Sequence, residues 1–217
     1  MDDIFREVDE EVRRDKALQF WTKYQNYIVV LMVLIVAAAG AWRWNADRER
    51  AAAEAAGSQF EAALALSRDN KPAEAEAAFQ DIIRQGHKGY ALLARLRAAA
   101  EVASTDAQKA VSIYETIAAD STVPALLQDV ARLRAAMLRL DAADADELKR
   151  RLEPLAKPTA PFRNSAREML AYGALKAKDY DAAARWLDEI TTDRDAPAGM
   201  RQRADTLLGL VAGAKAR

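Results

Sequence analysis

Residues 170–190, LAYGALKAKDYDAAARWLDEI, contain the pattern that decides the fold of this chain. The stretch predicts two helices joined by a short polar Lys-Asp turn. Ala171 on the first helix is small enough to let the second helix pack closely. Ala183, Leu187 and Ile190 recur at i, i+4 and i+7 on the second helix, so they share one face. We therefore expect a pair of antiparallel helices that pack through these residues.

The same pattern occurs three more times upstream, with successive units offset by 35, 38 and 35 residues. A period near 34 is typical of helical repeat proteins. Aligning the four units places equivalent residues in four columns. The column on the first helices contains Ala63, Ala98, Ala136 and Ala171. The three columns on the second helices contain Ala75, Ala110, Leu148 and Ala183; Phe79, Tyr114, Leu152 and Leu187; and Ile82, Ile117, Leu155 and Ile190. Polar turns within the units are expected at 68–72, 104–106, 141–144 and 178–179. Connections between the units are expected at 85–89, 121–124, 157–161 and 193–197, and most of these contain Gly or Pro.

This pattern resembles the tetratricopeptide repeat, and Ala171, Tyr180, Ala183 and Leu187 match its signature in the last unit. Residues 198–211 would then form a terminal helix that caps the last pair, as solenoids usually require. The composition agrees, because 50 alanines with only 8 Gly and 6 Pro favour helices throughout. A generic Ala-rich helical bundle is the alternative.

Residues 24–42 contain no charged side chain over 19 positions. A helix of this length spans about 28 Å, close to the ~30 Å hydrocarbon core of a bilayer. Aromatic residues flank the apolar run on both sides, as is typical of membrane interfaces. These are Phe20, Trp21, Tyr24, Tyr27, Trp42 and Trp44. The alternatives are a cleavable signal peptide, since Ala37 and Ala39 form an Ala-x-Ala site, and a helix buried within a soluble domain.

The sequence thus predicts an all-α protein with one N-terminal transmembrane helix, a tetratricopeptide-like solenoid of about four helix pairs and a C-terminal capping helix. The expected boundaries are 1–23 for an N-terminal helical segment, 24–44 for the transmembrane helix, 45–57 for a helical linker and 58–217 for the repeats. The helix should continue outward from the membrane into the first repeat, to near Ser67. In the N-terminal segment Ile4, Val8 and Val12 form a narrow apolar stripe, which indicates either a docking helix or a solvated extension.

The flanking charges bear on orientation, because Lys and Arg resist translocation. Five basic residues precede the apolar run and three follow it within a similar distance, which favours a cytoplasmic N-terminus and places the repeats on the opposite side. These residues are Arg6, Arg13, Arg14, Lys16 and Lys23 before the run, and Arg43, Arg48 and Arg50 after it.

The chemistry of an enzyme is not evident in this sequence. The chain has no Cys, and its one histidine, His87, lies in a Gly-flanked turn and is expected to be a solvated surface residue. We expect no catalytic residue, metal, cofactor or small-molecule substrate. The 32 basic and 33 acidic residues balance, and no basic tract is present, which argues against nucleic-acid binding.

A repeat solenoid offers a concave surface to peptides or partner helices. The side chains expected to line it on the first helices are Leu92, Arg95, Leu133, Met137, Glu168 and Tyr172. Helix packing or plain surface exposure is the alternative for each of them. The Asn and Lys residues with which one tetratricopeptide subclass binds a C-terminal carboxylate are not found at the corresponding positions.

The acidic segment DIFREVDEEVRRDKALQFWTKY, the single span and the Ala-rich repeats together resemble the YfgM-type family of bacterial inner-membrane proteins. That resemblance implies an ancillary subunit of the SecYEG translocon, with a cytoplasmic N-terminus and periplasmic repeats. It also implies contacts with periplasmic chaperones and a role in assisting exported proteins. A scaffold for envelope assembly or cell division and a regulator of an envelope stress response are the alternatives.

Overall fold

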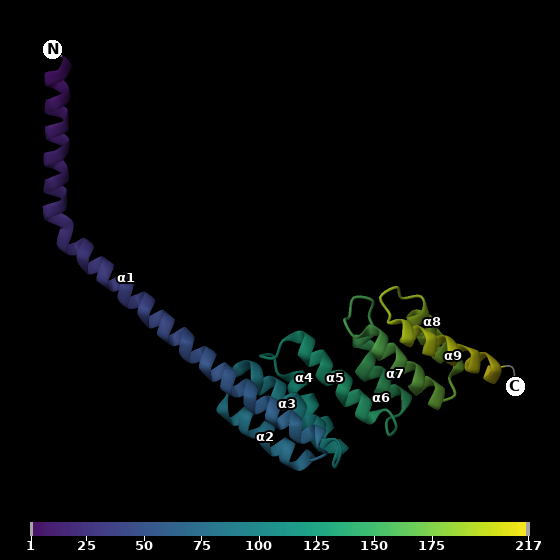
Figure 1. The fold of residues 1–217 in the computed structure, drawn as a ribbon. Coiled ribbons are helices and arrows are strands. Elements are labelled where there is room, and N and C mark those ends of the chain that lie inside the picture. Colours follow the sequence, from purple (N-terminus) through teal and green to yellow (C-terminus); the bar gives the residue numbers. More distant parts are fainter. Residues whose placement is uncertain (1, 216–217) are drawn as a thin grey trace. The chain divides into compact units, whose positions relative to one another are not determined.

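The computed structural model describes residues 2–215, apart from the side chains of residues 2–19 and Lys88. The part of the chain that it describes is helical and contains no strand, so the all-α prediction is confirmed (Figure 1). The chain consists of two compact units, Met1–Ala55 and Ala56–Arg217. The predicted stripe of Ile4, Val8 and Val12 lies outside the described side chains.

Helix α1, Asp2–Arg68, is unbroken, so the predicted continuation of the helix to near Ser67 is confirmed. From Phe20 onward it is long and apolar enough to cross a membrane, and no part of its most apolar window is buried. The large apolar side chains of residues 29–36 are all exposed. A core helix of a soluble protein would bury such a run, whereas a bilayer would remove it from water.

The second unit is built from helices that pack in chain order, as Figure 1 shows. The end of α1 pairs with α2, and three further pairs and a final helix follow, so the predicted four pairs with a cap are confirmed. The helices after α1 are α2 (Pro72–Gln85), α3 (Lys88–Val102), α4 (Ala107–Ala119), α5 (Ala125–Arg139), α6 (Ala145–Leu152), α7 (Arg163–Lys176), α8 (Tyr180–Thr191) and α9 (Ala198–Lys215).

The second helix of each pair begins at a residue that suits a helix start. Asp106, Asp144 and Asp179 each accept a hydrogen bond from a backbone N–H in the first turn of α4, α6 and α8, at 2.9, 2.7 and 2.9 Å. Such caps stabilise a helix by about 1 kcal/mol each. Helix α2 instead begins with Pro72, whose missing N–H costs nothing there. The second helix of every pair therefore begins at the end of the turn that the sequence predicted.

The aligned columns of the sequence form the core. No residue in the four columns is more than 3% exposed. All of them except Ala110 lie in four successive apolar clusters, each of which joins neighbouring helices. Phe79, Ile82, Leu152 and Leu187 are among the largest fully buried side chains. The predicted spacing is therefore a packing register, and the smaller Ala positions allow the helices to approach closely.

The third pair departs from regular geometry at its second helix. Helix α6 has only 8 residues and continues as a 3₁₀ turn, Glu153–Leu155, called η1. Pro154 causes this change because it lacks the N–H that an α-helix interior needs. Leu155 nevertheless remains 3% exposed and fills its column in the core.

Gly173 lies at a close contact between α6 and α7. A Cβ at this position would lie 2.7 Å from Cδ1 of Leu148, which is itself only 1% exposed. We expect Gly173→Val to lower the free energy of unfolding by about 1–3 kcal/mol, because the added carbons overpack the contact. Gly209→Val is the matched control in α9, where nothing lies within 4 Å of the added Cβ. It should change the free energy by less than about 0.5 kcal/mol, and equal losses would contradict this packing.

Glu147 connects α6 to α5 through Arg139, and Arg151 of α6 itself also contacts its carboxylate. Its carboxylate accepts hydrogen bonds from Arg139 Nε and Nη2 at 3.0 and 2.9 Å and from Arg151 Nε at 2.9 Å. Arg151 also donates to Glu115 on α4 at 2.6 Å. The hydrogen bonds from Arg139, reinforced by the one from Arg151, lower the pKa of Glu147 from 4.5 to about 2 against the opposing effect of burial.

This lowered pKa predicts a defined pH dependence. The charged carboxylate stabilises the fold above the unfolded-state pKa near 4.5, and that contribution is lost as pH falls to about 2. The melting temperature of Glu147→Gln should therefore lie below that of the unchanged protein at pH 7, and the gap should close between pH 4.5 and 2. Glu153→Gln removes an exposed carboxylate without a described ion pair and should show no such gap. A gap that persists at pH 2 would contradict the assignment.

Candidate partner-binding groove

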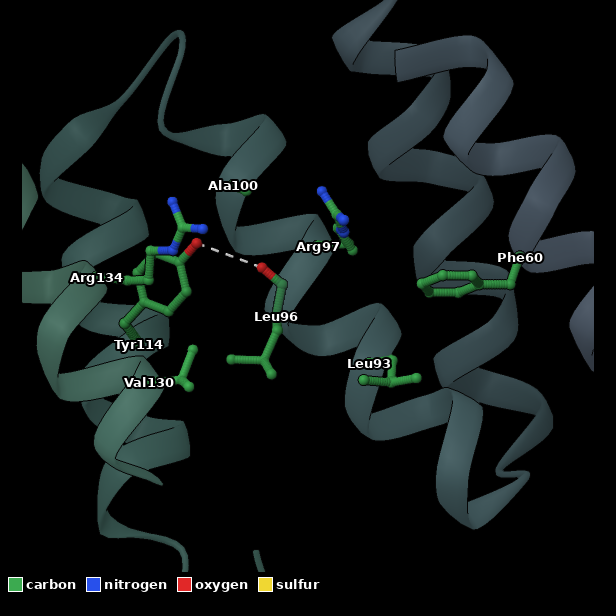
Figure 2. Close-up of a pocket in the computed structure, with 8 residues that line it drawn as sticks. All are labelled: Phe60, Leu93, Leu96, Arg97, Ala100, Tyr114, Val130 and Arg134. Carbon is green, nitrogen blue, oxygen red and sulfur yellow. Dashed lines mark hydrogen bonds between the residues drawn. The ribbon is translucent and has the colours of Figure 1, made fainter. Parts of the chain in front are cut away.

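The first helices of three successive pairs, α1, α3 and α5, line one cavity of about 390 Å³ (Figure 2). We call this cavity, with its extension toward Met137, the groove. Helix α1 contributes Phe60, which is half-buried, and α4 contributes Tyr114. The remaining lining residues are Leu93, Leu96, Arg97 and Ala100 from α3 and Val130 and Arg134 from α5.

Helical spacing places these side chains on the same side of the repeats. Leu93, Arg97 and Ala100 follow one another at i, i+4 and i+7 on α3, which is one helix face. Val130, Arg134 and Met137 do the same on α5. A second cavity of about 130 Å³ shares Ala100, Tyr114 and Arg134 with the first and adds Met137. The groove therefore extends along both helices.

Tyr114 forms the base of the groove. It is 3% exposed, and its hydroxyl donates a hydrogen bond to the carbonyl oxygen of Leu96 at 3.3 Å, which Figure 2 shows as a dashed line. Burial raises the pKa of Tyr114, and the positive charges of Arg134 and Arg97 act in the opposite direction. The phenol is thus neutral at pH 7 and holds α4 against α3, while both guanidinium groups are near enough to act on it.

Arg97 and Arg134 are the charged residues of the groove, and both are exposed. No acidic side chain lines either cavity. Within the described residues neither arginine forms an ion pair, whereas Arg95 on the same helix contacts Asp120 at 3.0 Å. Glu101 lies one turn after Arg97, but its carboxylate accepts a hydrogen bond from the Ser67 hydroxyl at 2.7 Å. The groove therefore combines apolar walls with two positive charges that lack a described carboxylate partner.

The structure distributes the six residues predicted to contact a partner over several environments. Met137 is 49% exposed and lines the extension of the groove, and Tyr172 is 37% exposed on α7. Leu92 and Leu133 are half-buried and pack against core clusters.

The remaining two of these residues are charged and form ion pairs. Arg95 contacts Asp120, and Glu168 accepts hydrogen bonds from Arg203 of α9 at 2.9 and 3.2 Å. The groove thus contains Met137 alone among the six, and a binding role for any of them stays a prediction.

Sequence reasoning missed Leu93, Arg97, Val130 and Arg134. The reason lies in α3 and α5, because each packs on both the preceding and the following helix and has only a narrow free face. On α3 the core takes Ala94, Ala98 and Ala99, which leaves the stripe that begins at Leu93. These residues could have been predicted from the sequence by taking the helix face opposite the alanines that fill the core.

His87 and the arginines of α7 lie outside the groove. His87 is half-buried beside Tyr90, with ring centroids 5.7 Å apart and a buried Nδ1, so the expectation of a solvated residue is wrong. Arg163 and Arg167 both contact Asp193, at 2.5 and 3.2 Å, and so fix the α8–α9 loop to α7. No group of three or more possible metal ligands occurs among the described residues.

Comparison with known proteins agrees with this architecture. A family model described as "Tetratricopeptide repeat-like domain" matches residues 18–185, which reach from a point just before the apolar segment of α1 into α8. Neither the curated proteins nor the solved structures gave a match. The match covers well over half of the chain, and it agrees with the buried columns and the order of the helix pairs. The chain belongs to the tetratricopeptide repeat-like domain family.

Proposed function

We propose that the protein is a membrane-anchored protein-interaction module and has no catalytic activity. The observation that carries this proposal is the groove, which is lined by the first helices of three successive pairs. Leu93 and Met137 expose large apolar side chains there, at 41% and 49%. Exposed apolar side chains that line a groove with polar neighbours are typical of surfaces that bind another protein.

The anchor is the uncharged segment of α1, and the side chains at its ends support this role. Tyr24 and Tyr27 precede the run and Trp42 and Trp44 follow it, as expected at the two headgroup levels. Arg48 lies over the Trp44 ring at 4.9 Å from its centroid, which suits a cation at the water side of the interface. The proposed domains are 1–23 in the cytoplasm, 24–44 in the bilayer, 45–57 as a helical linker and 58–217 as the repeats.

The proposed cellular role is that of an ancillary translocon subunit and chaperone adaptor. The resemblance to the YfgM-type family supports it, as does the excess of basic residues before the apolar run. In this role the N-terminus lies in the cytoplasm, and the repeats lie in the periplasm of a bacterial inner membrane. The groove would contact the SecYEG translocon, periplasmic chaperones or newly exported chains.

Orientation is tested by reporter fusions at the C-terminus. A reporter that is active only in the periplasm should be active there, and one that is active only in the cytoplasm should be silent. The reverse pattern would overturn both the orientation and the translocon role, because the repeats would then face the wrong compartment.

The partner is tested by affinity purification of the full chain in mild detergent, with quantification of translocon subunits against division and envelope-assembly proteins. We expect enrichment of translocon subunits with the unchanged protein. The variant Leu93→Ser should reduce that enrichment, whereas Arg185→Ser, an exposed change on α8 outside the groove, should not. Enrichment of division proteins instead would contradict the translocon role and keep the interaction module.

A further inference from the structure

The groove carries two positive charges, those of Arg97 and Arg134, and no acidic side chain lines it. Arg95, Arg139 and Arg163 all contact carboxylates on neighbouring elements within 3.0 Å. Arg97 and Arg134 line one cavity without such a partner among the residues described. Figure 2 shows their guanidinium groups on either side of Ala100 in that view. Two like charges beside one cavity repel each other, so an anion between them would relieve that repulsion and gain two attractions.

We propose that the groove binds an apolar protein segment that carries an acidic side chain, with its carboxylate between Arg97 and Arg134. This proposal rests on the proposed function and adds the chemistry of the partner. The apolar neighbours of the acidic residue pack against Phe60, Leu93 and Val130. A guanidinium group donates two parallel hydrogen bonds to a carboxylate, which fixes its position as well as its charge.

Two features of the site favour an acidic protein segment over a bare anion. The walls beside the arginines are apolar, and Leu93 alone exposes 41% of its surface, so a small ion would leave them in contact with water. The first cavity, of about 390 Å³, continues past Arg134 to Met137, which gives room for side chains before and after a central carboxylate. Apolar packing supplies affinity, and the arginines select which segment binds.

The test uses the full chain in a neutral detergent and three fluorescent peptides that differ only at their centre. The acidic probe is acetyl-GSLLEDLLGS-amide, the neutral probe has QN in place of ED, and the basic probe has KK. Binding is followed by fluorescence anisotropy in about 50 mM salt, where charges are weakly screened. We expect the acidic probe to bind about tenfold or more tightly than the neutral probe, and the basic probe to bind most weakly.

Variants assign the preference to the groove. The double variant Arg97→Gln and Arg134→Gln should bind the acidic and neutral probes equally. The control, Arg150→Gln with Arg185→Gln, removes two exposed arginines outside the groove and makes the same change in net charge. It should keep the preference. Leu93→Ser should weaken both probes and leave their ratio unchanged, and circular dichroism checks that every variant is folded.

The possible failures are distinct. Equal binding of acidic and neutral probes by the unchanged protein overturns the acidic-segment proposal, but the proposed interaction module still stands if Leu93→Ser weakens both. Loss of the preference in the Arg150 and Arg185 variant would also overturn it, because net charge would then explain the effect. Absence of binding by every probe overturns it as well, whereas the proposed function is judged separately by the affinity purification.

Discussion

Replacing Leu187 by Ala should lower the free energy of unfolding of the repeat domain by roughly 2–5 kcal/mol. Leu187 lies on α8, is 0% exposed and belongs to the cluster that joins α7, α8 and α9. Its neighbours in that cluster include Ala171, Ile190 and Val211. The substitution removes buried carbons and leaves a cavity that close-packed helices fill only in part.

The loss is measured by thermal and denaturant unfolding of residues 46–217, followed by circular dichroism. This fragment lacks the apolar segment, and we expect it to be soluble and strongly helical without added metal or cofactor. Arg185→Ala is the matched control on α8, because Arg185 is exposed and Ala is also a strong helix former. The control should change the free energy by less than about 0.5 kcal/mol. If both variants melt alike, the aligned columns are not a packing register.

Replacing Leu34 by Arg should remove the chain from the membrane. Leu34 lies near the middle of the uncharged segment, and an Arg there costs ~2.5–3.5 kcal/mol on insertion scales. A 19-residue apolar segment that ends in alanines has little surplus to offset this cost. The fraction of protein that sediments with membranes after carbonate washing should therefore fall strongly.

Ala52→Arg makes the same change in an exposed part of α1 beyond the aromatic residues and serves as the control. It should leave the membrane fraction unchanged. If Leu34→Arg stays fully embedded after washing, the membrane-spanning segment lies elsewhere.

The repeat register was predictable because a buried alanine on a first helix and a larger residue on its partner recur at nearly fixed spacing. Ala63 and Phe79 in the first pair and Ala171 and Leu187 in the last occupy equivalent places in the core. Gly and Pro between these positions marked the helix ends, since neither continues a helix well. The 3₁₀ turn after α6 was not predicted, although Pro154 is its visible cause.

The groove was harder to predict because it depends on how each first helix is rotated between two neighbours. On α3, Leu92 is half-buried whereas the next residue, Leu93, is exposed, so a small rotation of the helix would change which of them lines the groove. Ion pairs are equally hard to predict from the sequence. Arg95 contacts Asp120, which lies 25 residues later at the end of α4, whereas Arg97 forms no ion pair with a described carboxylate. Such partners depend on loop geometry that spacing in the sequence does not define.

Site-specific photo-crosslinking from the groove tests the central claim most directly. A photoreactive residue at Leu93, in the full chain expressed in living cells, should form adducts with translocon subunits or exported polypeptides. The same residue at Lys149, exposed on α6 outside the groove, should form few. An absence of adducts at Leu93, or equal yields at both positions, would contradict a groove that binds protein partners.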